Sequence, residues 1–134
     1  MQVMSYSNVL LIDDDEDDQE IFLLALRDVA ATIRCTTLAS ARTALDLLDA
    51  GELPFDLIFL DLNMPVMTGQ QFLSELQKRP IPNEIPIFIL STSSDPATVS
   101  LARQLGAQKF ITKPDNFAEL KKILHDILNQ HEHT

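Results

Sequence analysis

Short runs of apolar residues alternate along the chain with longer segments in which apolar and polar residues follow a helical period. A short apolar run is typical of a strand buried on both faces, whereas apolar residues recurring about every 3.6 positions indicate an amphipathic helix. The pattern predicts strands over about residues 9–12, 33–38, 55–60, 85–90 and 109–112. It predicts helices over about residues 16–31, 40–50, 95–105 and 116–129, and one more that follows Gly69. The chain is therefore expected to consist of five β/α units.

Strands this apolar require cover on both faces, which a parallel sheet with helices on each side provides. The expected fold class is α/β, with an open, doubly wound sheet whose functional site lies at the carboxyl ends of its strands. The first helix is expected to bury a wide face made of Ile21, Phe22, Leu24, Ala25, Leu26 and Val29. The last helix is expected to bury Phe117, Leu120, Leu124 and Ile127.

The chain is short and acidic, with 134 residues, 20 Asp or Glu, 10 Lys or Arg and a net charge of −10. This length suits a single domain, expected over residues 1–134 with a core at about 7–129 and without an output domain. Because nucleic acids and anionic membranes are bound through clusters of Lys and Arg, the charge argues against both as partners. Neither a membrane span nor a signal peptide is evident, so we expect a cytoplasmic location.

Glycine and cysteine usage excludes further classes of site. The three glycines, Gly51, Gly69 and Gly106, are too far apart to form a phosphate-binding loop or a dinucleotide fingerprint. Cys35 is the only cysteine, which excludes an intrachain disulfide and a zinc site built from thiolates. We expect Cys35 to be a small buried hydrophobic residue.

Polar side chains stand where four of the predicted strands end. Asp13 and Asp14 follow the first strand, and Asp61 follows the third. Ser91 ends the fourth strand, and Lys113 follows the fifth. These five side chains are expected to converge at one edge of the sheet. The rest of the acidic run, residues 15–18, is interpreted as ordinary charge at the start of the first helix.

The chemistry expected of this group is metal-assisted phosphoryl transfer. Three clustered carboxylates cannot all remain ionised without a cation, and oxygen ligands without His or Cys favour a hard ion such as Mg²⁺. A carboxylate beside Mg²⁺ and an ammonium group is suited to attack phosphorus and form an aspartyl phosphate. Lys113 is expected to pair with Asp61 before that reaction. FMN would need hydrogen-bond donors where residues 13–15 stand, so a flavodoxin function is not favoured.

Four motifs of this chain, in this order, resemble those of two-component response-regulator receiver domains. They are Leu11-Ile12-Asp13-Asp14-Asp15, Asp61-Leu62-Asn63-Met64-Pro65 with Gly69, Leu90-Ser91, and Phe110-Ile111-Thr112-Lys113-Pro114. The resemblance covers about residues 7–129 and is to stand-alone regulators of the chemotaxis type. It implies a five-stranded parallel sheet in the flavodoxin-like order 2-1-3-4-5. Residues 77–84 and 91–96 are also similar to the small regulators that are paired with bacterial phytochromes.

The resemblance implies a role for each residue at the strand ends. Asp61 would be the phosphoacceptor, and Ser91 and Lys113 would contact the phosphoryl group. The peptide bond between Lys113 and Pro114 would be cis and would aim the lysine inward. The ligands implied for Mg²⁺ are Asp14, Asp61, the backbone carbonyl of Asn63 and, mainly through water, Asp13.

The resemblance also implies a two-state switch. Phe110 would turn inward as Ser91 moves toward the phosphoryl group, and this would change a face formed by residues 95–129. The donor would be a histidine kinase or a phosphotransfer protein. An unidentified protein, or a second copy of the chain forming a homodimer through residues 95–129, would bind that face. The domain would catalyse only its own phosphorylation and dephosphorylation.

Three positions depart from the commonest pattern of the family. Ser91 stands where threonine is more usual, Phe110 where tyrosine is frequent, and Thr92 where alanine is usual. Phe110 lacks the phenol hydrogen bond of tyrosine, and Thr92 is expected to narrow access to the site. Asn63 and Ser93 stand where side chains flank the path of the hydrolytic water in relatives, and should set the lifetime of the phosphorylated state.

Two other functions would use these residues differently. Phosphatases of the haloacid dehalogenase type also combine an Asp nucleophile, Ser or Thr, Lys and Mg²⁺. Their motifs run in another order, however, and they require an acid where this chain has Asn63. An interaction module that works without phosphorylation would keep the fold but would not need a complete acidic pocket.

Overall fold

The computed structural model describes residues 6–51, 54–79 and 85–129, in which strands and helices alternate. The strands are β1 (Asn8–Ile12), β2 (Arg34–Leu38), β3 (Leu57–Leu60), β4 (Ile87–Ser91) and β5 (Lys109–Thr112). The helices are α1 (Glu16–Val29), α2 (Ala41–Asp49), α3 (Gly69–Gln77), α4 (Pro96–Gln104) and α5 (Phe117–Leu128). The five predicted β/α units are therefore confirmed.

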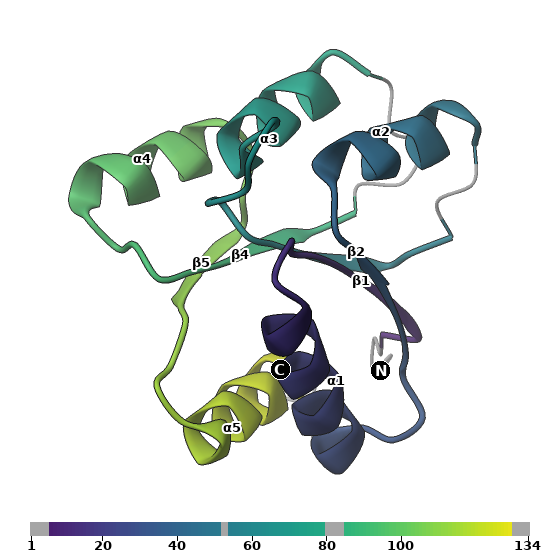
Figure 1. Ribbon diagram of the computed structural model, residues 1–134, viewed down its shortest axis with the longest axis vertical. Helices are drawn as coiled ribbons and strands as arrows, with labels where there is room; N and C mark the ends of the chain where they lie inside the picture. Colours follow the sequence, from purple (N-terminus) through teal and green to yellow (C-terminus); the bar gives the residue numbers. More distant parts are fainter. Residues whose placement is uncertain (1–5, 52–53, 80–84, 130–134) are drawn as a thin grey trace, which may run out of the picture.

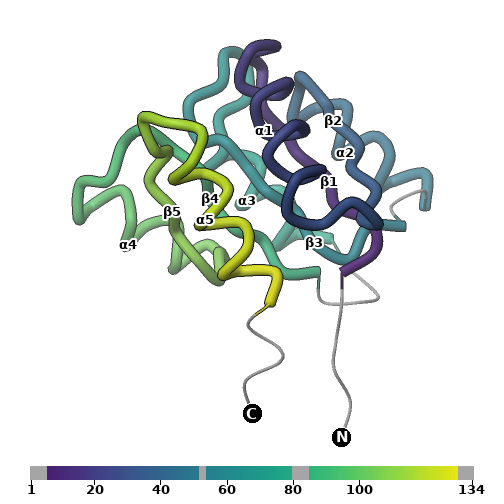
Figure 2. Tube along the Cα trace, turned by 90° about the horizontal axis from the view of Figure 1, so that it is seen from below, coloured from purple at the N-terminus to yellow at the C-terminus, as the bar shows by residue number. Residues whose placement is uncertain are grey.

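The strands form one parallel sheet in the order β2-β1-β3-β4-β5. Figure 1 shows α2, α3 and α4 on one face of this sheet and α1 and α5 on the other. Seen from below, α1 and α5 lie side by side in front of the sheet (Figure 2). This arrangement confirms the predicted α/β class and the strand order 2-1-3-4-5.

Alternate residues of the central strands face opposite sides of the sheet and build two apolar cores. On β1, Leu10 and Ile12 pack into the core under α2, α3 and α4, whereas Val9 and Leu11 pack into the core under α1 and α5. All four side chains are at most 1% exposed. Burial on both faces explains why the central strands are continuous apolar runs instead of alternating ones.

Side-chain caps fix where the helices beside the strand ends begin. Asp15 caps α1, where its carboxylate accepts hydrogen bonds from the N–H groups of Asp17 and Asp18. Thr68 caps α3 and forms a reciprocal capping box with Gln71. The loops that follow β1 and β3 therefore end at defined residues, which restricts how far the carboxylates on these loops can move.

The buried faces of two helices are narrower than the apolar pattern predicts. The fully buried side chains of α1 are Phe22, Ala25 and Leu26. Ile21 and Leu24 of the same helix are 44% and 49% exposed, and Phe117 of α5 is 38% exposed. A helix in an outer layer contacts the sheet along one stripe, so residues at the margins of a wide apolar face stay in contact with water.

The other differences concern single positions and strand starts. The strands β2, β3 and β4 begin one or two residues later than predicted, because their apolar runs start before the ladder does. Cys35 is half-buried on the edge strand β2, and burial raises the pKa of its thiol to about 12.

Other features agree with the sequence analysis. Gly51 has a φ of +75°, in the left-handed conformation expected after α2. Among the described residues, no helix is long and apolar enough to cross a membrane.

Candidate functional site

The backbone brings the polar residues of the strand ends to one edge of the sheet. The ladder continues one residue beyond β3, since the N–H of Asp61 donates to the carbonyl oxygen of Ile12 at 3.0 Å. Asp13 follows Ile12 directly. On the other side of β3, the N–H of Lys113 donates to the carbonyl oxygen of Ser91 at 2.7 Å. The structure thus brings together the strand-end residues that the sequence indicated.

Three of these residues form a carboxylate cluster. Asp13, Asp14 and Asp61 can each place one oxygen within 4.8 Å of the other two. Asp13 and Asp61 are only 2% and 5% exposed, whereas Asp14 faces solvent. A few carboxylates with one open side suit Mg²⁺, which keeps several waters or exchanges them for phosphate oxygens. The residues present therefore fit the ion that the sequence predicted.

Burial makes the ionised form of the buried carboxylates costly. It raises the pKa of Asp61 to about 6, opposed by the hydrogen bond from the N–H of Asn63 and by the charge of Lys113. The charges of Asp13 and Asp14 raise it further. Burial also raises the pKa of Asp13. A divalent cation bound at the cluster would favour the ionised forms and so reverse these shifts.

Lys113 lies among three carboxylates. Its Nζ is 2.8 Å from an oxygen of Asp18, 3.1 Å from one of Asp13 and 3.6 Å from one of Asp61. Burial lowers the pKa of this ammonium group, but the hydrogen bond to Asp18 and the charges of Asp61 and Asp13 raise it by more. Lys113 therefore stays charged, and the contact predicted with Asp61 is the longest of the three.

Two expectations need correction, one about the peptide bond after Lys113 and one about the role of Asp18. The peptide bond between Lys113 and Pro114 is trans, as are all those between described residues, and the lysine still reaches the site. Asp18 is more than helix-start charge, because it forms the shortest ion pair of the site. The sequence contained a signal for this role. Asp18 lies four residues before Phe22 and eight before Leu26, which places it on the buried face of α1.

Ser91 and Asn63 are linked by a hydrogen bond beside Asp61. Ser91 is fully buried, and its Oγ accepts hydrogen bonds from Asn63 Nδ2 at 3.4 Å and from the N–H of Ser93 at 3.2 Å. The N–H of Asn63 donates to Asp61 Oδ1 at 3.1 Å. Thr92 is exposed at the rim. The hydroxyl of Ser91 is thus linked to the phosphoacceptor candidate through Asn63.

Phe110 lies on β5, away from the carboxylates. It is half-buried and packs against the core under α2, α3 and α4, together with Leu105. Ile89 on β4 is its partner in the sheet register. Phe110 is therefore paired with β4 in the sheet and packs against the same core as Leu105, which follows α4.

The loop between β3 and α3 contains two backbone constraints that the sequence analysis did not identify. A Cβ at Gly69 would lie 2.6 Å from Leu62 Cδ2 and 2.8 Å from the carbonyl oxygen of Asp61, so only glycine fits there. Val66 has a φ of +68° and is fully exposed. A β-branched residue is strained in this conformation. The loop that carries Asp61 is therefore tightly packed at Gly69 and strained at Val66.

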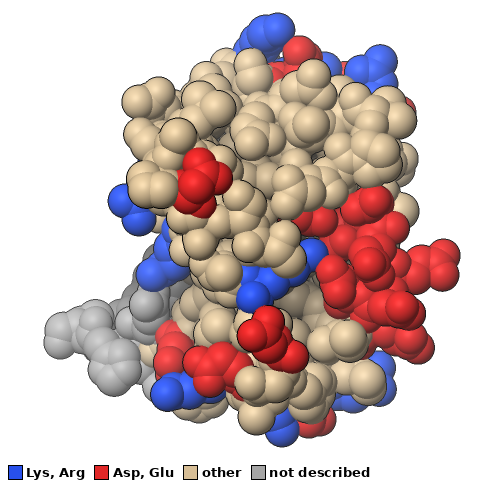
Figure 3. Space-filling model, turned by 60° about the vertical axis from the view of Figure 1, so that its left-hand side comes forward, with Lys and Arg blue, Asp and Glu red and all other residues tan. Residues whose placement is uncertain are grey.

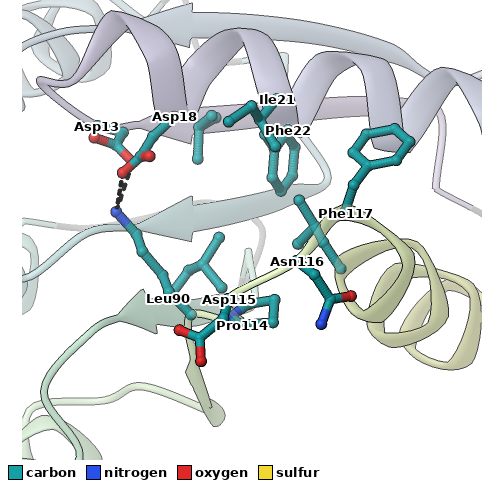
Figure 4. A pocket seen from close by; sticks show the side chains of 12 residues that line it. Asp13, Asp18, Ile21, Phe22, Leu90, Pro114, Asp115, Asn116 and Phe117 are labelled. Carbon is teal, nitrogen blue, oxygen red and sulfur yellow. Dashed lines mark hydrogen bonds and ion pairs between the residues drawn. The ribbon is translucent and has the colours of Figure 1, made fainter.

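A hollow of about 180 Å³ opens beside Lys113, between α1 and the segment that joins β5 to α5. Figure 4 shows the carboxylates of Asp13 and Asp18 at one end of it and Phe117 at the other. Its other lining residues include Ile21 and Pro114. The hollow therefore joins the charged site to the exposed apolar residues of the two helices.

Acidic side chains dominate the surface around the site. Figure 3 shows them gathered densely on one side of the molecule. Residues 14–17 of the acidic run are exposed, and Asp18 is half-exposed. Such a surface repels anions, and Lys113 is the basic group that offsets this charge at the carboxylate cluster.

A sequence model described as the response regulator receiver domain matches residues 9–125. The chain belongs to this family. The two-component response regulator ORR13 of Oryza sativa subsp. japonica is 33% identical to this receiver domain over 124 residues, which are 92% of the chain and 100% of the relative. Another curated relative is longer, and the receiver domain spans only 27% of its length at 29% identity.

Two solved structures resemble the receiver domain closely. The phosphorylated cyanobacterial phytochrome response regulator RcpA has a TM-score of 0.84 at 26% identity, over 96% of each chain. The Mn²⁺-bound form of response regulator Rcp1 has a TM-score of 0.81 at 25% identity, again over 96% of each chain. These likenesses agree with the predicted resemblance to receiver domains that include phytochrome-associated regulators.

Proposed function

We propose that this receiver domain accepts a phosphoryl group on Asp61 in a reaction that depends on Mg²⁺. The observation that supports this most is the position of Asp61. Its carboxylate is buried, lies 3.6 Å from Lys113 Nζ and belongs to the cluster with Asp13 and Asp14. The similarity to a phosphorylated regulator and to a Mn²⁺-bound one supports the same function.

The chemistry follows from the groups around Asp61. A carboxylate oxygen would form a bond to phosphorus while the bond from phosphorus to the imidazole nitrogen of a phosphohistidine breaks. That nitrogen keeps the electron pair and takes up a proton. Lys113 and Ser91 would bind the phosphoryl oxygens. Mg²⁺, when held by Asp13, Asp14, Asp61 and the backbone carbonyl of Asn63, would offset the charge of the carboxylates and the phosphoryl group.

The proposed donor is a histidine kinase or a phosphotransfer protein, in the cytoplasm of a bacterium. The imidazole must reach Asp61, so the donor protein must lie over the rim of the site. Ile21 and Phe117 line the hollow next to Lys113 and are 44% and 38% exposed. These apolar side chains suit a protein contact, and we place the donor against them.

The proposed output is a change on the face formed by residues 95–129. Ser91 would move toward a phosphoryl group on Asp61, and Phe110 would turn inward into the space left. Phe110 packs against the same apolar core as Leu105, which follows α4, so we expect that helix to shift when Phe110 turns inward. Phosphorylation would then change the affinity of this face for a downstream protein or for a second copy of the chain.

The test is incubation with acetyl phosphate and Mg²⁺, followed by intact-mass measurement. The chain should gain one phosphoryl group, and EDTA or Asp61→Asn should prevent the gain. Asp56→Asn is a matched control, because Asp56 precedes β3, at the opposite end of that strand from Asp61, and its carboxylate accepts hydrogen bonds from the N–H groups of Ser7 and Asn8. Equal labelling of Asp61→Asn would contradict the proposal.

Three further outcomes separate the alternatives. Many turnovers of a phosphate monoester would instead indicate a phosphatase, whereas we propose that the domain catalyses only its own phosphorylation and dephosphorylation. Partner binding that is equal with and without phosphorylation would indicate an interaction module. Sedimentation of the phosphorylated chain as a dimer would favour a second copy as the partner over an unrelated downstream protein.

A further inference from the structure

Asp18 forms the shortest contact of the site lysine although it belongs to a helix and not to a strand end. Its Oδ2 lies 2.8 Å from Lys113 Nζ, compared with 3.6 Å for the nearest oxygen of Asp61. The dashed line that meets the Asp18 carboxylate in Figure 4 marks this contact. The lysine side chain is 15% exposed and that of Asp18 is 40% exposed. The lysine is thus held on the α1 side of the site.

We propose that Asp18 is a positioning residue that holds Lys113 away from Asp61 and thereby opposes phosphorylation. This inference rests on the proposed function of Asp61. One ammonium charge is shared among three carboxylates. An ion pair with one of them therefore reduces the electrostatic stabilisation that Lys113 provides to the other two. Asp18 is not one of the three carboxylates of the cluster, which are Asp13, Asp14 and Asp61.

The direction of the effect follows from charge. A phosphoryl group on Asp61 carries about two negative charges and would attract Lys113 away from Asp18. The carboxylate of Asp18 would then lose its partner. The ion pair with Asp18 therefore stabilises the unphosphorylated state more than the phosphorylated one, and its removal should favour phosphorylation.

The effect can be separated from a general loss of negative charge because the chain offers a matched control. Asp17 is the neighbour of Asp18 in the first turn of α1, carries the same charge and is exposed. None of the ion pairs formed among the described residues involves Asp17. Asp17→Asn thus removes one negative charge from the N-terminal turn of α1, as Asp18→Asn does, but it leaves the ion pair between Asp18 and Lys113 in place.

The experiment measures the rate of labelling by acetyl phosphate at saturating Mg²⁺, with the donor concentration varied. Asp18→Asn should be labelled about two- to fivefold faster than the wild type, the range for loss of a partly exposed ion pair. Asp17→Asn should match the wild type, and Asp18→Glu should restore the slower rate. Equal rates for Asp18→Asn and Asp17→Asn would overturn the inference and leave the proposed function intact.

A second readout does not depend on labelling. The ¹⁵N NMR signal of the Lys113 ammonium group should move in Asp18→Asn and stay in place in Asp17→Asn. If the wild type is not labelled on Asp61, the proposed function fails, and this signal still decides whether Asp18 positions the lysine. An unchanged signal in Asp18→Asn would refute that positioning by itself.

Discussion

The N–H of Asp61 donates to the carbonyl oxygen of Ile12 at 3.0 Å, one residue beyond the end of β3. This single ladder bond places Asp61 next to Asp13, the residue that follows Ile12. Two carboxylates that are 48 positions apart in the sequence are thereby buried together at the edge of the sheet. Their proximity follows from the parallel pairing of β1 with β3, and it underlies the predictions below.

The first prediction concerns stability and pH in the absence of Mg²⁺. Burial raises the pKa of Asp61 from 3.8 to about 6, so the folded chain binds this proton more tightly than the unfolded chain does. The resulting stabilisation is complete below the unfolded pKa and is lost as the pH rises through about 6. Between about pH 4 and 7, the free energy of unfolding should fall by about 1–3 kcal/mol more in the wild type than in Asp61→Asn.

Urea unfolding in EDTA at several pH values measures this difference. Asp49, Glu75 and Asp95 have lowered pKa values and also make stability depend on pH. Their contributions cancel in the comparison with Asp61→Asn, because these groups are present in both chains. Added Mg²⁺ should reduce the difference, since it favours the ionised carboxylate. If the free energies of unfolding of the wild type and Asp61→Asn change in parallel with pH, burial does not raise the pKa of the Asp61 carboxyl group.

The second prediction concerns Gly69, which packs against the loop that carries Asp61. Gly69→Ala would place a Cβ 2.7 Å from Leu62 Cα and 2.8 Å from the carbonyl oxygen of Asp61. Because these are backbone atoms, the loop must shift, at a cost of about 1–3 kcal/mol in the free energy of unfolding. Labelling by acetyl phosphate should also slow, since Asp61 moves with the loop.

Gly51→Ala is the control for this substitution. Gly51 has a φ of +75° but no atom within 4 Å of an added Cβ. Its substitution should cost about 1 kcal/mol from the left-handed backbone alone and leave the labelling rate unchanged. Equal labelling rates for Gly69→Ala and the wild type would show that the loop position does not matter for the reaction.

The third prediction concerns the strained loop residue Val66. Its φ of +68° disfavours a β-branched side chain, and its full exposure means that no packing is lost on substitution. Val66→Asn should raise the free energy of unfolding by about 0.5–1 kcal/mol, because Asn tolerates the left-handed region. Val66→Thr keeps the branch and adds polarity, so thermal or urea unfolding should show no gain for it. A gain for Thr as large as that for Asn would assign the effect to polarity instead of strain.

The fourth prediction concerns the hollow beside Lys113. Ile21→Ala should slow phosphotransfer from a histidine kinase that phosphorylates the wild type, by about threefold or more, because it removes apolar contact area at the proposed docking surface. Labelling by acetyl phosphate should not change, since Ile21 is apolar and is not one of the carboxylates of the cluster or a partner in the Lys113 ion pairs. Leu101→Ala on α4 is the control, because Leu101 is equally exposed at 44% but belongs to the other face. Equal slowing by both variants would argue against this docking surface.

Much of the fold could be predicted from the sequence because a doubly wound sheet buries its central strands completely. Runs such as residues 9–12 and 57–60 are apolar at every position, and capping residues such as Asp15 and Asp95 mark where helices begin. The apolar pattern could not show how much of each helix would be covered. Ile21 and Leu24 belong to the apolar face of α1, yet only the packing of α1 against the sheet and α5 determines that they stay exposed.

The candidate site divides in the same way. The sequence was enough to identify the residues at the carboxyl ends of the strands, because a strand end is a local property. Asp13, Asp61 and Ser91 each follow or close an apolar run, and Lys113 follows the short predicted strand over residues 109–112. How the single ammonium charge of Lys113 is shared could be seen only in the folded chain. Its distances to Asp13, Asp18 and Asp61 depend on how α1 and the strands pack together. Contacts between residues 52 to 100 positions apart leave no local pattern in the chain.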